Sequence, residues 1–210
     1  MRVLAVNPAA PREDKLAEAI DVLAGGGVVA LATETVYGLA VDASNLTALR
    51  RVNPLKDKAE LSPILLLLAD RLQVAQVSDD LPATFDALVD RFWPGPLTLV
   101  IRASSGVPRE ITGGRDTVAV RVSGSALPRR LAAGLGRPIS GVSANLTGRL
   151  PCRTAGEVAR SFPEGLDMIL DGGPAPGGVS STIVDLSRTP AQVLREGLVP
   201  LIALRPFLEK

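Results

Sequence analysis

The segment TVAVRV, residues 117–122, alternates between valine and other side chains with a period of two. Such alternation is typical of a β-strand that buries one face, so it places Val118, Val120 and Val122 toward a hydrophobic core. Arg121 stands between two of these valines and therefore points to the opposite face. The segment predicts a strand that carries one cation on the side away from its core.

Apolar runs on both sides of this segment predict the other strands of a sheet. Strands are expected at residues 28–32, 64–68, 97–102, 138–142, 168–170, 181–186 and 192–195. Apolar residues at helical spacing predict helices at residues 12–24, 46–52, 81–92, 126–135 and 154–162. Asn53 and Pro54 are expected to end the second helix, because proline lacks an amide hydrogen. The pattern predicts a single α/β domain over residues 1–210, in which one mixed sheet is flanked by helices.

The composition is that of an ordinary globular protein. Hydrophobic residues make up 46% of the 210 residues and charged residues 21%, which excludes the disordered and fibrous classes. The longest apolar run, residues 64–69, is far shorter than the roughly 20 residues of a membrane span. The first residues show no signal peptide and Cys152 is the only cysteine. We therefore expect a cytoplasmic protein without disulfides or membrane contact.

The chain contains no histidine, which excludes Ser-His-Asp triads, Cys-His dyads and HExxH zinc sites. The formal net charge is +1. A balanced charge argues against a protein that binds nucleic acid over a wide surface, but it is compatible with a local basic cavity.

Several polar segments carry candidate chemistry, and each also has a structural interpretation. The segment KDK, residues 56–58, precedes a central strand and fits either a phosphate site or a solvated turn. The segment SANLTG, residues 143–148, fits either an anion cradle of backbone amides or a hydrogen-bonded turn. The polar groups of residues 33–35 fit either a ligand for an amino group or a helix cap. Arg195, late in the last strand, fits either an anion ligand or a structural ion pair.

These segments belong to one colinear series of motifs. The series is ATETVYGLA, KDK followed by Pro63, RFWPGPLTLV, TVAVRV, SANLTG, ILDGG, SSTIVD and LREG. From about residue 10 to about residue 200 it resembles the YrdC/Sua5/YciO family in its short, single-domain form. The resemblance implies a YrdC-like twisted mixed sheet that encloses a deep basic cavity. It also implies an L-threonylcarbamoyladenylate synthase, which makes threonylcarbamoyl-AMP and pyrophosphate from L-threonine, bicarbonate and ATP for the t6A modification of tRNA.

By this resemblance the candidate site residues fall into three groups. The catalytic step is assigned to Lys56, Lys58, Ser143 and Asn145. Threonine binding is assigned to Thr35, Arg121 and Ser181, with Arg121 in a bidentate pair with the threonine carboxylate. ATP binding is assigned to Lys58, Ser62, Thr117, Ser143 and Arg195, and Lys56 is expected to help neutralise the triphosphate. The expected cofactor is Mg²⁺, carried mainly by the ATP phosphates, with no metal ligands from the protein.

The resemblance also implies partners, and this chain differs from the usual family sequence at some positions. A threonylcarbamoyl transferase complex is the expected downstream partner, and weak binding of tRNA or other RNA is compatible with a basic cavity. The family usually has Lys-x-Arg where this chain has KDK, and many members have His where Leu67 stands. Lys58 keeps the positive charge but lacks the planar fork of arginine, so the departure bears on ATP affinity more than on the fold.

Two alternatives stay open on the sequence alone. A paralogue of the YciO kind, or a carbamoyl-adenylating relative of the hydrogenase-maturation domain, would keep the cavity and change the substrate, and Lys58 favours this reading. A non-catalytic RNA-binding module would bind RNA in a salt-sensitive way without turning over ATP. The net charge of +1 speaks against the second alternative.

Overall fold

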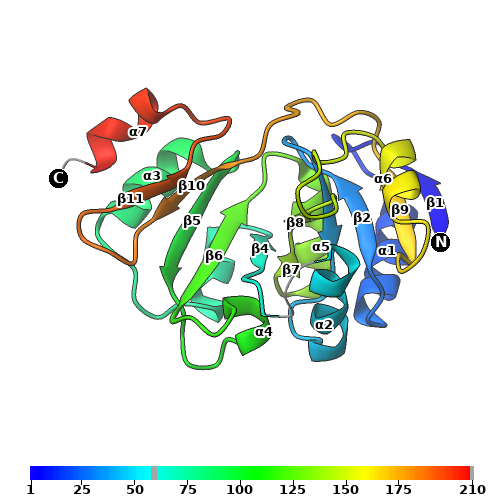
Figure 1. Ribbon diagram of the computed structural model, residues 1–210, viewed down its shortest axis with the longest axis horizontal. Helices are drawn as coiled ribbons and strands as arrows, with labels where there is room; N and C mark the ends of the chain where they lie inside the picture. Colours follow the sequence, from blue (N-terminus) through cyan, green and yellow to red (C-terminus); the bar gives the residue numbers. More distant parts are fainter. Residues whose placement is uncertain (58–60, 209–210) are drawn as a thin grey trace.

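The strands form two mixed sheets where the sequence pattern suggested one, within the mixed α/β class that was expected. The computed structural model describes residues 1–57 and 61–208. The five-stranded sheet has the order β1 (Arg2–Ala5), β9 (Met168–Asp171), β2 (Val29–Ala32), β3 (Tyr37–Ala40) and β8 (Val142–Ser143). The six-stranded sheet has the order β11 (Gln192–Arg195), β10 (Thr182–Asp185), β5 (Leu97–Arg102), β6 (Thr117–Val122), β4 (Leu65–Leu68) and β7 (Ile139–Ser140). Figure 1 shows the six-stranded sheet on the left and the five-stranded sheet on the right.

The chain passes from one sheet to the other within residues 138–143. One strand was expected here, but β7 pairs with β4 and β8 pairs with β3, so the segment contributes a short strand to each sheet. Gly141 lies between them, and its amide donates to the carbonyl of Leu65 at 2.7 Å. A Cβ at Gly141 would lie 2.5 Å from Cγ of Leu67, so the crossing point requires glycine. This crossing brings the edges of the two sheets together.

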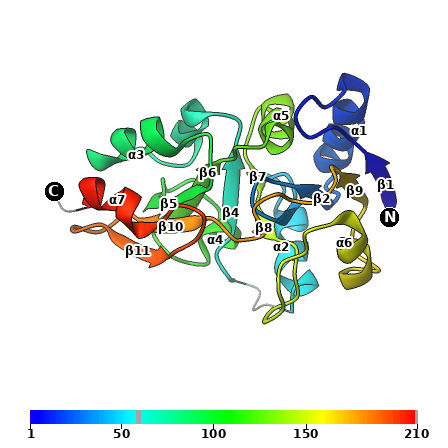
Figure 2. The ribbon, with the colours of Figure 1, turned by 90° about the horizontal axis from the view of Figure 1, so that it is seen from above.

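Helices pack against both sheets. They are α1 (Glu13–Ala24), α2 (Leu46–Leu55), the 3₁₀ helix η1 (Arg71–Gln76), α3 (Thr84–Phe92), α4 (Arg109–Thr112), α5 (Ala126–Leu135), α6 (Ala155–Ser161) and α7 (Leu201–Leu208). Figure 2 shows α1, α5 and α3 along one side of the molecule. Phe85 of α3 shares a core cluster with Val118, Val120 and Val122. Arg121 therefore points to the other face of β6, which confirms the prediction from alternation.

The second helix differs from the expectation at its C-terminal end. Asn45 begins α2, and its side chain accepts a hydrogen bond from the amide of Ala48 at 3.0 Å. The helix then continues through Pro54 to Leu55. A proline in the last turn forfeits only one helical hydrogen bond, so the helix tolerates it there.

Residues 33–36, one of the polar segments, form the turn of the hairpin between β2 and β3, in which Ala32 pairs with Tyr37. The hydroxyl of Thr33 donates to the carbonyl of Val36 at 2.7 Å and closes the turn. These residues begin no helix of their own, and β3 itself was not expected from the sequence. None of the helices in the described ranges is long and apolar enough to cross a membrane.

The central position of β4 leads to a stability prediction. Leu66 is fully buried in the larger core cluster, whereas Leu72 in η1 is 78% exposed. We expect Leu66→Ala to lower the free energy of unfolding by about 2–5 kcal/mol, because it removes buried carbons and leaves a cavity. The control Leu72→Ala should change it by less than about 0.5 kcal/mol. Urea unfolding followed by circular dichroism measures both, and equal losses would contradict the placement of β4 in the core.

Candidate active site

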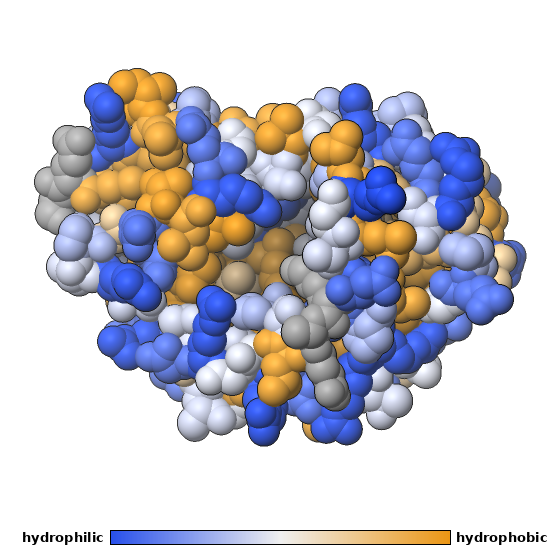
Figure 3. Space-filling view, viewed as in Figure 1, coloured by the Kyte–Doolittle hydropathy of each residue, from blue (hydrophilic) through white to orange (hydrophobic). Residues whose placement is uncertain are grey.

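A cavity of about 290 Å³ lies between the two sheets. Figure 3 shows it as a hollow at the centre of one face, with hydrophobic side chains inside and both hydrophilic and hydrophobic ones around it. Among the described residues its charged lining consists of Lys56, Arg115, Arg121 and Arg195, and none of its described lining residues is acidic. Cations around a confined space attract anionic ligands, so the chemistry of this cavity is that of anion binding.

Arg121 of β6 reaches the hairpin turn on the other sheet. Its Nη2 donates to Oε1 of Glu34 at 2.7 Å and to the hydroxyl of Thr35 at 3.3 Å. The side chain is only 4% exposed, and its buried Nε has no hydrogen-bond partner among the described residues. A buried donor without a partner costs free energy. The structure thus brings two predicted threonine-binding residues, Thr35 and Arg121, together.

Glu34 holds Arg121 in place and was not among the predicted site residues. Its Oε2 accepts hydrogen bonds from the hydroxyl of Ser123 and, at 3.3 Å, from the amide of Ser125. Burial raises the pKa of Glu34, but the Arg121 guanidinium and the Ser123 hydroxyl outweigh it, so the pKa lies below its usual 4.5. Glu34 is therefore a carboxylate at neutral pH. Its position between two threonines in the motif ATETVYGLA was the signal that could have assigned it to the site.

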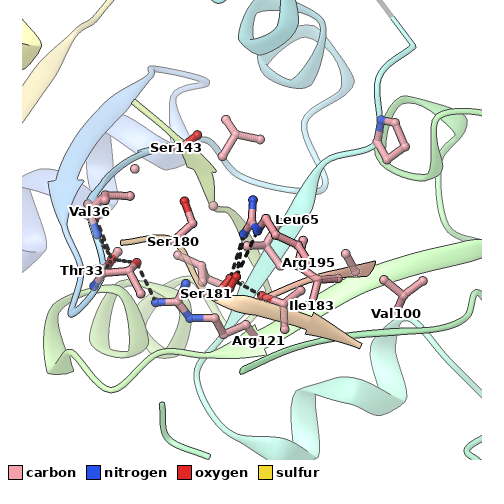
Figure 4. A pocket seen from close by; sticks show the side chains of 18 of the residues that line it. Thr33, Val36, Leu65, Val100, Arg121, Ser143, Ser180, Ser181, Ile183 and Arg195 are labelled. Carbon is pink, nitrogen blue, oxygen red and sulfur yellow. Dashed lines mark hydrogen bonds between the residues drawn. The ribbon is translucent and has the colours of Figure 1, made fainter. Parts of the chain in front are cut away.

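Ser181 and Arg195 form a second polar group on the six-stranded sheet. The Oγ atoms of Ser181 and Thr98 lie 2.8 Å apart. Arg195 donates to the carbonyl of Ser181 from Nε at 3.1 Å and from Nη2 at 2.8 Å. Figure 4 shows these bonds, together with those that join Arg121 to the turn containing Thr33 and Val36. Burial and the nearby charge of Arg121 both lower the pKa of Arg195, so these two cations repel each other unless an anion lies near them.

Lys56, Ser143 and Asn145 also come together, at the end of α2. Lys56 is 3% exposed, and its ammonium donates to the carbonyl of Ser143, to the Ser143 hydroxyl at 3.2 Å and to Oδ1 of Asn145 at 3.4 Å. In return the carbonyl of Lys56 accepts from the amide and hydroxyl of Thr147, at 3.0 and 2.7 Å. The ammonium therefore holds the loop that contains Ser143 and Asn145. Its expected contact with the triphosphate stays a prediction.

The remaining predicted residues either lie outside the cavity lining or fall outside the described residues. Ser62 and Thr117 are not part of the cavity lining, although Thr117 shares a face of β6 with Arg121. The prediction for Lys58 falls outside the described residues. Arg115 lines the cavity and was missed. It follows Gly113 and Gly114, which both have positive φ, so the pair of glycines before the β6 segment was its signal in the sequence.

The Mg²⁺ expected with ATP stays a prediction. Among the described residues no three His, Cys, Asp or Glu side chains gather as a metal site. A Mg²⁺ ion that enters this cavity would be held by phosphate oxygens and water, with at most hydroxyl groups such as that of Ser181 nearby.

Comparison with known proteins identifies the family. A family model named for Sua5, YciO and YrdC, and described as "Telomere recombination", matches residues 21–197. The chain belongs to the Sua5/YciO/YrdC family. The match covers all the motifs in the colinear series, so the resemblance seen in the sequence is confirmed.

Relatives within the Sua5/YciO/YrdC family are named as enzymes. The chain is 39% identical to a Threonylcarbamoyl-AMP synthase of Pyrococcus abyssi over 90% of its own length and 56% of that protein. It is 37% identical to a Threonylcarbamoyl-AMP synthase of Halorhodospira halophila over 79% of its length and 86% of that protein. The crystal structure of Pyrococcus abyssi Sua5 complexed with L-threonine matches with a TM-score of 0.94 and 36% identity, over 99% of this chain and 61% of that one. The chain therefore spans little more than half of the archaeal protein and most of the bacterial one.

The contacts of Lys56 lead to a prediction about the loop at residues 143–149. Lys56→Met removes the ammonium that bonds to Ser143 and Asn145, so we expect faster amide hydrogen exchange in this loop. The loss of these bonds should lower the free energy of unfolding by about 1–3 kcal/mol. Hydrogen exchange with mass spectrometry measures the first effect and urea unfolding the second. Lys15→Met, on α1, is the control, and unchanged exchange at residues 143–149 in Lys56→Met would contradict the role of Lys56.

Proposed function

We propose that this protein is an L-threonylcarbamoyladenylate synthase, a nucleotidyltransferase that joins L-threonine, bicarbonate and ATP into threonylcarbamoyl-AMP and pyrophosphate. The observation that carries the proposal is that Arg121 and Arg195 line the same cavity, whose described lining contains no acidic residue. One substrate carries a carboxylate and the other a triphosphate, so two separate cationic groups match the two anions. The similarity to Sua5 complexed with L-threonine supports the first of these ligands.

Threonine binding is assigned to the end of the cavity near the hairpin turn. Arg121 is assigned to the threonine carboxylate, and its Nη2 lies beside Thr35. A bidentate pair through Nε and Nη2 requires a side-chain shift that exposes the buried Nε and releases the bond from Nη2 to Thr35. The Ser181 hydroxyl, held by Thr98, offers a further polar contact on the neighbouring strands. Arg195 and Lys58 would lie toward the triphosphate.

The chemistry requires positioning more than proton transfer. The threonine amine reacts with bicarbonate to give a carbamate and water. A carbamate oxygen then attacks the α-phosphorus of ATP, the bond from this phosphorus to the β-phosphate bridge breaks, and pyrophosphate leaves. The carbamate is already an anion, so a chain without histidine is able to carry out this step through orientation and charge neutralisation. Mg²⁺, bound to the phosphates, would neutralise the leaving pyrophosphate.

The wider context follows from the same proposal. The product would pass to a threonylcarbamoyl transferase complex that modifies tRNA, and the reaction would take place in the cytoplasm. Weak binding of RNA near the basic cavity is compatible with this role. The KDK segment favours one other candidate, a carbamoyl-adenylating paralogue with a different acceptor.

Omission of single substrates tests the proposed function. We expect pyrophosphate release from ATP and Mg²⁺ to require both L-threonine and bicarbonate, because only their carbamate supplies the nucleophile. A coupled pyrophosphate assay measures the release, and mass spectrometry identifies threonylcarbamoyl-AMP. Bound ATP with no release would instead support the paralogue, and salt-sensitive RNA binding without turnover would support an RNA-binding module.

Matched lysine substitutions test the two cationic groups. Arg121→Lys keeps a cation beside Glu34 but removes Nε, so we expect the KM for threonine to rise about tenfold or more, with little change for ATP. Arg195→Lys should raise the KM for ATP instead. Steady-state kinetics with one substrate varied at a time measures both. The opposite pattern, or equal effects on both substrates, would reject this assignment of the two arginines.

A further inference from the structure

The two arginines of the cavity differ in the charge that surrounds them. Arg121 is paired with the Glu34 carboxylate at 2.7 Å. Arg195 donates only to uncharged oxygens of Ser181, and within the described ranges it forms no salt bridge. The charge of Arg121 is therefore offset by an anion, whereas Arg195 has no anionic partner within the described ranges. Here the Arg121 end and the Arg195 end of the cavity mean the space beside each guanidinium.

Glu34 is a fixed negative charge on the far side of Arg121. It does not line the cavity with the arginines but lines a second cavity of about 390 Å³ behind it. Its Oε2 is held by the Ser123 hydroxyl and the Ser125 amide, at the start of α5. The carboxylate is thus tied on one side to a helix and on the other to Arg121, and it has little freedom to move away.

This fixed charge distinguishes between classes of anion. A dianion on Arg121 would lie about 6 Å from the Glu34 carboxylate, and Coulomb's law disfavours it there by about tenfold even at the dielectric constant of water. A zwitterionic amino acid places its carboxylate on Arg121 and its ammonium close by. Glu34 repels the first charge and attracts the second, so the two effects largely cancel while the amino acid binds. Once the amine has become a carbamate, its negative charge must face the cations on the Arg195 side of the cavity rather than Glu34.

We propose that Glu34 is a specificity-determining residue, which offsets the charge of Arg121 so that this end of the cavity accepts a zwitterionic amino acid and rejects phosphate groups. The inference rests on the proposed function for the identity of the amino acid. It adds to the proposed function an explanation of how one cationic cavity keeps a triphosphate out of the threonine subsite. Phosphate groups then bind beside Arg195 and the other cations of the lining, away from Arg121.

Sulfate is a suitable probe, because it stays a dianion and resembles a phosphate group. Isothermal titration calorimetry on the wild-type protein would measure ATP and threonine binding with and without sulfate. We expect sulfate to compete with ATP and to leave the threonine affinity unchanged. Sulfate that competes with threonine in the wild type would overturn the proposal, and this experiment depends on no variant.

Substitutions of Glu34 separate its charge from its shape. Glu34→Gln removes the charge, so we expect sulfate to bind about tenfold more tightly at the Arg121 end and to compete with threonine there. Glu34→Asp keeps the charge and should exclude sulfate as the wild type does. Glu13→Gln, at a residue that is 80% exposed on α1, is the surface control. A Glu34→Gln protein that is folded by circular dichroism and still excludes sulfate would overturn the proposal.

Sulfate stoichiometry separates this inference from the proposed function. We expect Glu34→Gln to bind one more sulfate than the wild type, and this difference requires neither threonine nor turnover. A wild type that shows this behaviour but releases no pyrophosphate would reject the proposed synthase and support the charge assignment. Equal numbers of bound sulfates in the wild type and in Glu34→Gln would reject the charge assignment, whatever the protein catalyses.

Discussion

Glu34 belongs to a hairpin of the five-stranded sheet and Arg121 to a strand of the six-stranded sheet, so the ion pair between them joins the two sheets across the cavity. Both side chains are largely buried. Removing one partner of such a pair leaves a buried charge and typically costs about 3–5 kcal/mol. The distance between the sheets, and with it the width of the cavity, therefore depends on this pair remaining closed.

A second set of contacts also holds the two sheets together. The loop that leads from β9 in one sheet to β10 in the other passes over the hairpin turn, where the amides of Gly177 and Gly178 donate to the carbonyls of Glu34 and Thr35. The chain also crosses between the sheets at Gly141. Side chains from both sheets consequently meet around one space, and the cations among them create a site that neither sheet forms alone.

The sequence predicted much of this arrangement, because its strongest signals are local. The alternation of valines placed Arg121 off the core face, and the order of motifs pointed to Thr35, Ser143 and Ser181. The local pattern does not show which strands pair, so it merged β7 with β8 and missed the hairpin strand β3. The role of Glu34 depends on a contact 87 residues away along the chain, which no local spacing encodes.

The cavity is built from distant parts of the chain, from the hairpin turn near the N-terminus to Arg195 on β11. Contacts of such wide separation must overcome a large loop-closure entropy, which favours slow folding. During synthesis β11 leaves the ribosome after the other strands that line the cavity, so the anion site is completed only when Arg195 has emerged. A ligand that binds this site stabilises the finished molecule and gives no such help to a nascent or shortened chain.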